Sequence, residues 1–407
     1  MTARHGPRPA LAALAAILLA VVAAGCGITY KMPTETRENR GIPGAGTYQR
    51  IDTWTGMAGI QDILLTPSGE LFLLFQDPVA RRGHVYRYPQ SVPTPLAELT
   101  GPANDPTAAW DPAAVGFGGN RVFVLDQGDT SAARVDRPSE YFAEYKADAD
   151  TTTVPLHGFS RPIARLGAYW HVREYYLDGR PVPDGSGGVA GFTDTSFAWV
   201  SGVAADVAPD GTRRVYVAGV ILFCNVDPFD DHVRTLEFRY RIRRYLPGGG
   251  DRFVVGPWRR DRTYLVIEGT GFGSAKDPRG MQWSAAQGPA LYFADRGNNQ
   301  VQKYGDPAGS STSFKLDIGG TGADSLLLVQ PLDVAVDSAG CVYLVDAGNL
   351  RVLRYGPWGD FVQRVDGVHP SDVGRPLLGP VAVAADNRQV YVADRGAGEV
   401  RRYRRLE

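Results

Sequence analysis

The chain has 407 residues, enough for one large repeat domain or for two or three domains of ordinary size. Its composition is that of a globular protein, with 43% hydrophobic and 21% charged residues, and its 49 glycines and 29 prolines favour β structure with many turns. The formal net charge of −1 provides no concentrated basic surface, so we expect no nucleic-acid partner.

The N-terminus has the layout of an export signal. Basic residues precede the apolar run Leu11–Ala24, which is short for a membrane span and typical of a secretory signal peptide. The run ends in Ala-Ala-Gly-Cys at Cys26, which resembles a bacterial lipobox. The resemblance implies a signal peptide over residues 1–25, acylation of Cys26 with palmitate-like chains, and a lipid-anchored place in the cell envelope, outside the cytoplasm. The alternative is an ordinary cleaved signal followed by a chance cysteine.

Residues 26–45 are polar and contain glycine and proline, which predicts a flexible tether. Besides Cys26 the chain has only Cys224 and Cys341, which fall in different repeats. We expect these two to be unpaired buried thiols rather than a disulfide.

From residue 46 to the C-terminus one short β-rich segment recurs. The clearest copy, Gln330–Tyr355, is predicted to form three strands separated by the turns DSAG and AGN. Its strands are DVAV, VYLVD and RVLRY. Five further copies, some of them degenerate, begin at Gly59, Asp111, Gly202, Gly280 and Gly379.

Four copies share Asp-x-Gly after the second strand, at Asp126, Asp295, Asp346 and Asp394, while Phe75 and Gly219 hold this place in the other two. Regular copies recur about every 50 residues, which fits one four-stranded propeller blade per copy. The pattern of proline, apolar strand, DG-like turn, VYVAD-like strand and R-x-[RK]-Y-like strand resembles the NHL repeat. The resemblance covers residues 46–407 and implies an all-β, six-bladed NHL-like β-propeller.

The end of the chain predicts how the ring closes. The last copy stops after its third strand, at Tyr403, whereas the preceding copy continues into GDFVQRVD. The segment GTYQRID, from Gly46 to Asp52, shares the Gln-Arg-[Val/Ile]-Asp pattern. We therefore expect this N-terminal strand to complete the last blade and remove its exposed edge.

Two insertions, at about 139–200 and 220–275, interrupt the regular spacing. In the first, YWHVREYYLDGRPV is predicted to be a hairpin with Asp178-Gly179 in its turn. It either supplies blade strands or projects as a recognition surface of Tyr169, Trp170, Tyr175 and Tyr176. In the second, Asp227, Asp230, Asp231 and His232 lie in a proline-containing loop without recognised metal-ligand spacing. A seventh blade within either insertion remains open.

Residues that recur with the repeat are expected to serve the scaffold. The aspartate of Asp-x-Gly can accept hydrogen bonds from turn amides, while its glycine is expected to supply a positive φ. The tyrosines of the second strands are expected to pack within the blades; they are Tyr216, Tyr292, Tyr343 and Tyr391. Arg296 and Arg395, in the shared Asp-Arg-Gly register, are either solvated turn residues or part of an anion-attracting rim.

Polar residues that break the repeat near the start of the innermost strand are better candidates for a site. Alignment to Asp333 places Asp62, Ala114, Ala204, Gln282 and Ala382 in equivalent positions. Asp62, Gln282 and Asp333 would then converge at the channel mouth, where carboxylate and amide oxygens suit a divalent cation such as Ca²⁺ or a polar ligand. Asp111 and Asp206 are weaker members of the set, and scattered channel residues are the alternative.

These features predict a membrane-anchored lipoprotein whose propeller is a non-catalytic scaffold for a protein, peptide or glycan. The alternative is a metal-assisted hydrolase or lyase, lactonase-like or amidating-lyase-like, that uses the channel, with Asp62 and Asp333 as metal ligands. None of the six histidines directly follows an Asp-x-Gly aspartate, so the histidine array of amidating lyases is not visible. No nucleophile elbow or phosphate loop is present either.

Overall fold

The computed structural model describes residues 47–77, 82–99, 112–126, 161–162, 170–185, 188–194, 197–226, 234–250, 254–270, 274–305, 313–319, 327–366 and 374–406. Contacts divide the chain into the units Met1–Glu38 and Asn39–Glu407, and every described residue belongs to the second. The export signal, Cys26 and the tether therefore lie outside the described residues. Within the described part no helix is long and apolar enough to cross a membrane.

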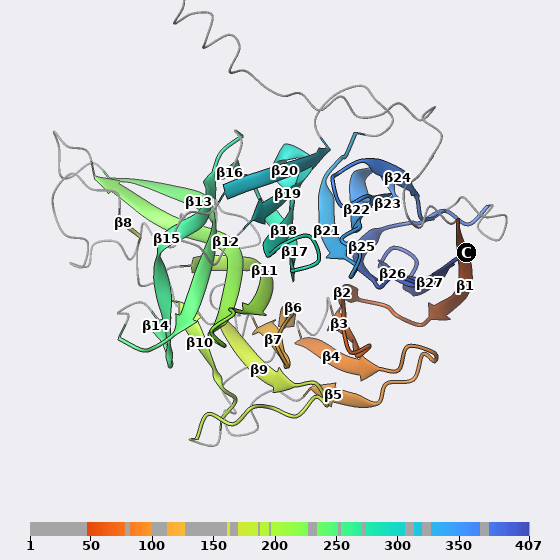
Figure 1. Cartoon of the computed structure of the whole chain (residues 1–407). Helices are drawn as coiled ribbons and strands as arrows, with labels where there is room; N and C mark the ends of the chain where they lie inside the picture. The colour runs from red at the N-terminus through yellow and green to blue at the C-terminus, as the bar shows by residue number, and fades with distance from the viewer. Residues whose placement is uncertain are drawn as a thin grey trace, which may run out of the picture. The chain divides into compact units, whose positions relative to one another are not determined.

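The second unit is a six-bladed β-propeller, as the repeat predicts (Figure 1). All described strands fall into six sheets. The innermost strands are β2 (Ile60–Leu65), β6 (Pro112–Gly118), β11 (Phe197–Val207), β17 (Pro278–Ser284), β21 (Pro331–Val336) and β25 (Pro380–Ala385). Each packs against the next, and β25 packs against β2, so the ring is complete with six blades.

Each inner strand pairs with an antiparallel second strand, and most blades follow the four-stranded plan. The first blade adds β3 (Leu71–Asp77), β4 (Arg82–Tyr88) and β5 (Ala97–Leu99). The fourth adds β18 (Ala290–Asp295), β19 (Gln300–Gly305) and β20 (Ser313–Gly319), and the fifth adds β22 (Val342–Asp346), β23 (Arg351–Tyr355) and β24 (Phe361–Arg364). One-turn 3₁₀ helices, η1 (Arg296–Asn298) and η2 (Ala347–Asn349), follow β18 and β22.

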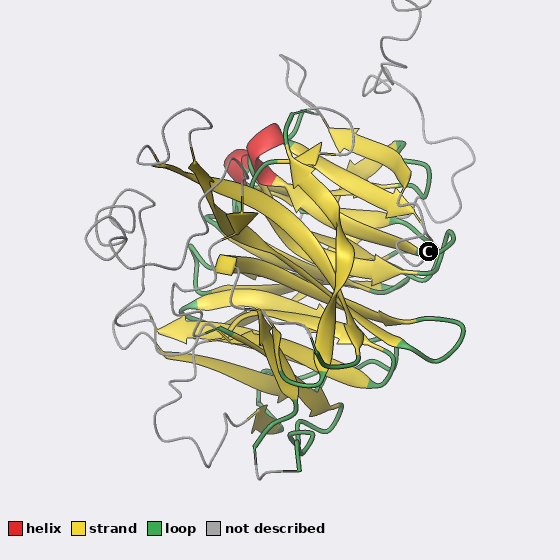
Figure 2. Cartoon of the chain, turned by 90° about the vertical axis from the view of Figure 1, so that its left-hand side faces the viewer, coloured by secondary structure: helices red, strands yellow, loops and turns green. Residues whose placement is uncertain are grey.

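The second and third blades contain the strands of both insertions. The second comprises β6, β7 (Arg121–Asp126), β9 (His171–Tyr176), β10 (Gly191–Asp194) and β14 (Val254–Val255). The third comprises β11, β12 (Arg213–Val226), β13 (Arg234–Pro247), β15 (Trp258–Glu268) and β16 (Ser274–Ala275), with β8 (Arg161–Pro162) beside β12. Figure 2 turns toward the viewer the side of the ring on which β13, β14 and β15 lie in Figure 1. The insertions therefore contribute blade strands.

The N-terminal strand closes the last blade, as predicted. This sheet runs β1 (Tyr48–Thr55), β27 (Glu399–Arg405), β26 (Gln389–Asp394), β25. β1 pairs antiparallel with β27 from Tyr48, opposite Arg405, to Thr55, opposite Glu399. Trp54 of β1 is 1% exposed and lies against Tyr88 and Tyr391, whose ring centroids are 5.9 and 6.1 Å away. The strand thus joins the last blade to the first through its core side chains.

The four repeated tyrosines are confirmed as packing residues, since each is at most 1% exposed. Tyr343 also forms a 2.7 Å hydroxyl–hydroxyl bond with Tyr48, which ties the fifth blade to the sixth. Cys341 is an unpaired buried thiol, as expected, and Arg354 donates to its Sγ at 3.1 Å. Cys224 lies in β12, and its side chain is outside the described residues.

We predict that Trp54→Ala lowers the free energy of unfolding by about 3–5 kcal/mol, because it leaves a cavity between the last and first blades. Trp358 is 69% exposed at an outer turn, so Trp358→Ala is the matched control and should stay within about 0.5 kcal/mol. Urea unfolding of both variants measures the difference. Equal effects would contradict the closure role of β1.

Candidate functional site

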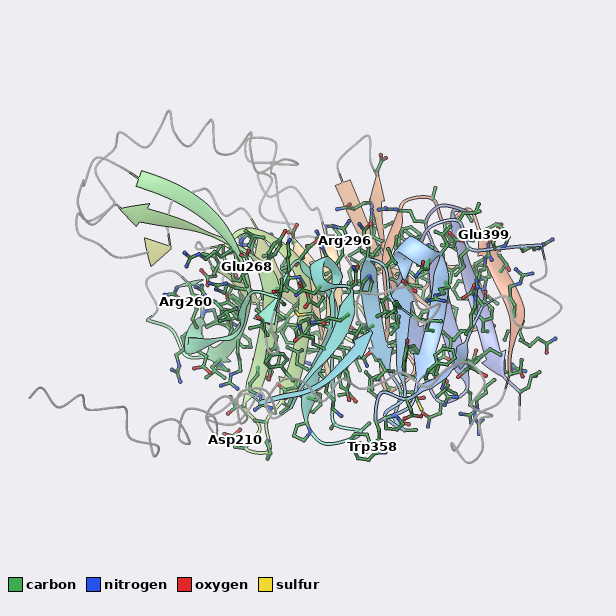
Figure 3. All side chains as sticks on the ribbon, turned by 90° about the horizontal axis from the view of Figure 1, so that it is seen from above. Asp210, Arg260, Glu268, Arg296, Trp358 and Glu399 are labelled. Carbon is green, nitrogen blue, oxygen red and sulfur yellow. The ribbon has the colours of Figure 1, made fainter. Side chains whose placement is uncertain are left out.

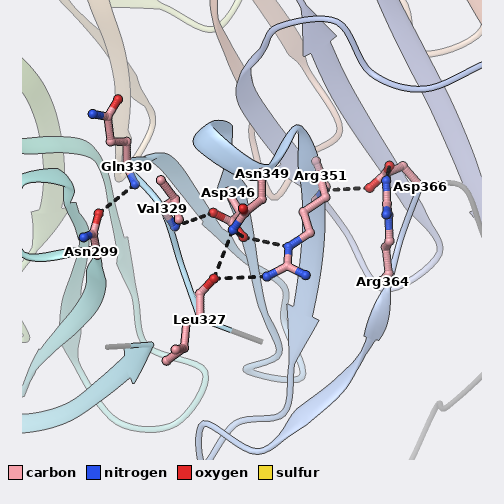
Figure 4. Close-up of polar contacts among 10 residues, drawn as sticks. Asn299, Leu327, Val329, Gln330, Asp346, Asn349, Arg351, Arg364 and Asp366 are labelled. Atoms are coloured by element: carbon pink, nitrogen blue, oxygen red, sulfur yellow. Dashed lines mark hydrogen bonds and ion pairs between the residues drawn. The ribbon is translucent and has the colours of Figure 1, made fainter. Parts of the chain in front are cut away.

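The aspartates of the Asp-x-Gly motif are structural, as predicted. Asp126, Asp295, Asp346 and Asp394 are all 0% exposed. In the fifth blade Asp346 accepts hydrogen bonds from the backbone N–H of Val329 at 2.7 Å, from Asn349 Nδ2 at 2.8 Å and from Arg351 Nε at 2.7 Å (Figure 4). The carboxylate therefore joins the connector before the inner strand to the turn and to the third strand.

The same arrangement recurs with different donors. Asp295 accepts from the Lys276 backbone N–H at 2.7 Å and from Gln302 Nε2 at 2.6 Å. Asp394 accepts from the Gly379 N–H at 2.8 Å and forms an ion pair with Arg401 at 3.2 Å. Burial raises the pKa of Asp295, and its hydrogen bonds oppose this rise.

The expected reason for the glycine of this motif is wrong. Gly297, Gly348 and Gly396 do not have positive φ; in these turns the left-handed residues are Asn299, Leu350 and Gly398. Instead the glycines approach the connector backbone closely. A Cβ on Gly348 would lie 2.7 Å from the carbonyl oxygen of Val329 and 2.4 Å from its Cγ1. Glycine is required here because any side chain would collide with the strand connector.

We predict that Gly348→Ala destabilises the fold by about 1–3 kcal/mol, because the connector must move away from the added methyl group. Gly249, whose Cβ would meet only a carbonyl oxygen at 3.9 Å, provides the control, and Gly249→Ala should be within about 0.5 kcal/mol of the parent. Thermal and urea unfolding test this. A neutral Gly348→Ala would show that the close approach is not needed.

The candidate recognition surface in the first insertion is mostly inside the blade. Trp170 and Tyr175 are 3% and 0% exposed. Trp170 packs edge-on against Phe197, and Tyr175 belongs to the core between the first and second blades. The recognition-surface prediction is therefore wrong for these two, because β9 is the third strand of a blade.

Of the other two members of that surface, Tyr176 is half-buried, with Arg121 over its ring at 4.1 Å, and Tyr169 lies outside the described residues. The predicted hairpin is present, with Gly179 at φ +91° in its turn. Asp111 and the cluster Asp227, Asp230, Asp231 and His232 also lie outside the described residues.

A cavity of about 1000 Å³ runs along the ring axis and is lined by all six inner strands. Its wall is mainly alanine, glycine and valine, with Asp62, Gln282 and Asp333 among its polar residues. The predicted alignment holds for Asp62 and Asp333, which pair with Leu74 and Val345 at the same step of their second strands.

Two predicted positions are displaced by two residues. Tyr216, Tyr292 and Tyr343 are equivalent residues of the second strands, and they pair with Ala204, Gln282 and Ala335. Ala204 and Gln282 are therefore equivalent to Ala335, which lies two residues beyond Asp333. Ala204 and Gln282 thus lie deeper in the channel than Asp333. The first hairpin of each of these blades contains additional residue pairs, which an alignment on the apolar pattern of the inner strand cannot detect.

The three polar residues join neighbouring inner strands. Asp62 Oδ2 accepts from the N–H of Val115 in the second blade at 2.9 Å, and Asp333 Oδ2 accepts from the N–H of Val383 in the sixth at 2.8 Å. Gln282 receives the N–H of Val336 at 2.8 Å and donates to its carbonyl at 3.1 Å. They satisfy backbone groups that no sheet ladder reaches.

Asp333 is accommodated by a glycine of the preceding blade. A Cβ on Gly280 would lie 2.2 Å from Asp333 Oδ1. Burial raises the pKa of Asp62 to about 7, and burial together with the charge of Asp62 raises that of Asp333 well above the usual range. The charge of Asp62 therefore opposes ionisation of Asp333, although the two carboxyls belong to different blades.

Asp206 does not belong to this group. It pairs with Arg214, whose Nε is 2.8 Å away, and accepts from Tyr216 at 3.3 Å. It occupies the place of Asp337, which accepts from Tyr343 at the far end of β21. Burial raises the pKa of Asp206, and Arg214 opposes the rise. Asp206 thus lies near the opposite end of the channel from Asp62.

The donor set does not fit calcium. Ca²⁺ takes six to eight oxygen ligands, whereas Asp62 and Asp333 bring two carboxyls that already accept backbone hydrogen bonds. Among the described residues no group of three or more His, Cys, Asp or Glu side chains could hold a metal ion.

No protein-family model and no curated protein matches the chain. Among solved structures it is similar to a catalytically inactive variant of virginiamycin B lyase from Staphylococcus aureus with quinupristin, at 10% identity over 88% of this chain and 99% of that chain, with a TM-score of 0.43. A streptogramin B lyase structure gives 11% identity, 88% coverage of both chains and a TM-score of 0.41. At this level no residue role transfers from those lyases.

We predict that stability falls as pH rises through 7. Between the unfolded pKa of 3.8 and about 7, folded Asp62 keeps a proton that the unfolded chain has released. Each rise in pH over this range therefore favours the unfolded chain, and the loss of stability is complete above about 7. Asp62→Asn should reduce the loss between pH 5.5 and pH 8 by on the order of 1 kcal/mol or more. Urea unfolding at both pH values measures it. An unchanged slope would contradict the raised pKa.

Proposed function

We propose that this protein is a binding protein of the cell envelope, anchored through a lipid on Cys26, whose propeller channel takes a small extracytoplasmic ligand or the end of a peptide or glycan. The observation that carries the proposal is the axial cavity of about 1000 Å³, which lies at the upper end of the range for ligand pockets. Its wall is apolar, with a few convergent polar groups, which is the usual make-up of such pockets.

The polar groups of the wall favour binding over catalysis. Asp62, Gln282 and Asp333 each hold a neighbouring inner strand, so their first role is to keep the channel rigid. A rigid wall lowers the cost of ordering on binding. A metal-assisted hydrolase or lyase is the competing function, and it would require these same carboxyls as metal ligands.

Native mass spectrometry tests channel binding. Full-length protein incubated with the low-molecular-weight fraction of an envelope extract should carry a one-to-one adduct. Ala385→Phe, which adds a ring to the channel wall, should lose the adduct, whereas Val92→Phe, at a site 46% exposed in an outer loop, should keep it. An adduct that survives Ala385→Phe, or no adduct at all, would overturn the proposal.

Two further measurements address the anchor and the competing enzyme. Cys26→Ser should move the protein from the membrane fraction to the soluble fraction, and retention would contradict lipidation.

Metal analysis of purified protein distinguishes a metal-assisted enzyme from a binding protein. Bound divalent metal that disappears in the Asp62→Ala, Asp333→Ala double variant would favour a metal-assisted reaction over the binding role.

A further inference from the structure

Apart from the buried Asp62 and Asp333, the charged residues that line the axial channel are separated by sign along its length. Arg279 is the second residue of β17, and Arg296 and Arg395 directly follow β18 and β26, whose last residues pair with the first residues of inner strands. Asp206, Asp337 and Asp386 line the opposite end, where the inner strands finish. Figure 3 shows Arg296 on one face of the ring and Asp210, in the hairpin after β11, on the other.

The carboxylates of the acidic end are hydrogen-bonded within their own hairpins. Asp206 pairs with Arg214. Asp337 accepts from the N–H of Cys341 at 2.9 Å, and Asp386 accepts from the N–H groups of Arg388 and Gln389, both at 2.7 Å. Asp206 thus has a cationic partner, whereas the bonds to Asp337 and Asp386 come from uncharged N–H groups, so this end stays acidic and repels an anion.

The basic end has an excess of positive charge. Arg279 and Arg296 share one carboxylate, that of Asp277, at 2.8 Å each. Arg395 is exposed and donates to the neutral amide oxygen of Gln61 at 2.9 Å. Three guanidinium groups therefore line this mouth, and within the described part of the chain only Asp277 forms an ion pair with any of them. A mouth lined by one sign of charge concentrates ligands of the opposite sign.

Beside Arg395 an apolar side pocket opens from the same mouth. It has a volume of about 360 Å³ and is lined by Leu332, Ala347, Leu378, Pro380 and Val381, together with Arg395 and two glycines. Leu332, Val381 and Arg395 also line the channel, so the two cavities adjoin. Leu378 is 59% exposed, so its side chain is accessible to a ligand in this pocket.

We infer that the basic mouth binds an organic anion, a carboxylate or a phosphate, that carries an apolar substituent. Arg395 receives the anionic group, because its guanidinium is planar, exposed and held by a neutral partner that an anion can replace. The substituent packs into the side pocket against Leu332 and Leu378. This inference rests on the proposed binding function and names the chemical class of its ligand.

Four simple probes separate charge from apolar contact. They are 4-phenylbutyrate, 4-phenylbutyl phosphate, the neutral 4-phenylbutanamide and acetate. Isothermal titration of purified full-length protein should show binding of the two phenyl-bearing anions, with weaker binding of the amide and of acetate. Comparison of the carboxylate with the phosphate tells which anionic group the mouth prefers.

Variants locate the binding. Arg395→Gln should weaken both phenyl-bearing anions at least tenfold and leave the amide unchanged, whereas Leu378→Asn should weaken all three phenyl-bearing probes. Arg180→Gln removes an exposed arginine from the hairpin after β9 and should change nothing. Both Arg395 and Leu378 are exposed, so unfolding midpoints should match that of the parent, which shows that lost affinity reflects the site.

The inference is overturned if no probe binds at millimolar concentration, if the amide binds as tightly as the acids, or if Arg395→Gln keeps full affinity for them. Such results would leave the proposed function standing whenever the Ala385→Phe variant still abolishes the adduct from the envelope extract. If the probes bind but the envelope extract gives no adduct that depends on Ala385, the protein has an anion site at the rim and no ligand-binding channel.

Discussion

In four of the six blades, the buried carboxylate at the end of the second strand is the interaction on which the arrangement of the strands most depends. It accepts hydrogen bonds from the connector before the inner strand, from the turn that follows or from the third strand. An ionised carboxylate that is fully buried is stable only when such donors surround it. Each of these aspartates therefore fixes the position from which an inner strand starts, and thereby the geometry of the channel mouth.

This structural role also places the charges at the mouth. Arg296 and Arg395 directly follow Asp295 and Asp394, so the buried carboxylates determine where these guanidinium groups leave the scaffold. Neither arginine pairs with the aspartate beside it in the chain. Arg296 reaches Asp277, and Arg395 reaches Gln61 in the next blade. A motif that serves stability thus carries, at its next residue, the groups that face a ligand.

The polar residues of the channel wall are explained by the unpaired edge of each inner strand. Each inner strand pairs with its own blade on one side, and on the other side its backbone groups have no ladder. Asp62, Gln282 and Asp333 supply partners from the neighbouring blade. Burial in the apolar wall raises the pKa of both carboxyls, and their mutual repulsion raises that of Asp333 further. Both carboxyls of this part of the wall thus hold their protons more tightly than an exposed aspartate does.

The sequence by itself determined the fold class, the number of regular blades, the closure by the N-terminal strand and the scaffold role of the repeated Asp and Tyr residues, because all of these depend on local periodicity and on residues that recur together. Tertiary structure alone decided which polar residues share a depth in the channel, since extra hairpin pairs shift Gln282 and Ala204 by two residues. It also decided why the motif needs glycine. A side chain on Gly348 would collide with Val329, and no local sequence pattern shows that these two segments lie so close together. The grouping of three arginines at one mouth, beside an apolar pocket, arises in the same way. Arg279 and Arg296 belong to the fourth blade and Arg395 to the sixth, so only the closed ring brings Arg395 to the same mouth as the other two.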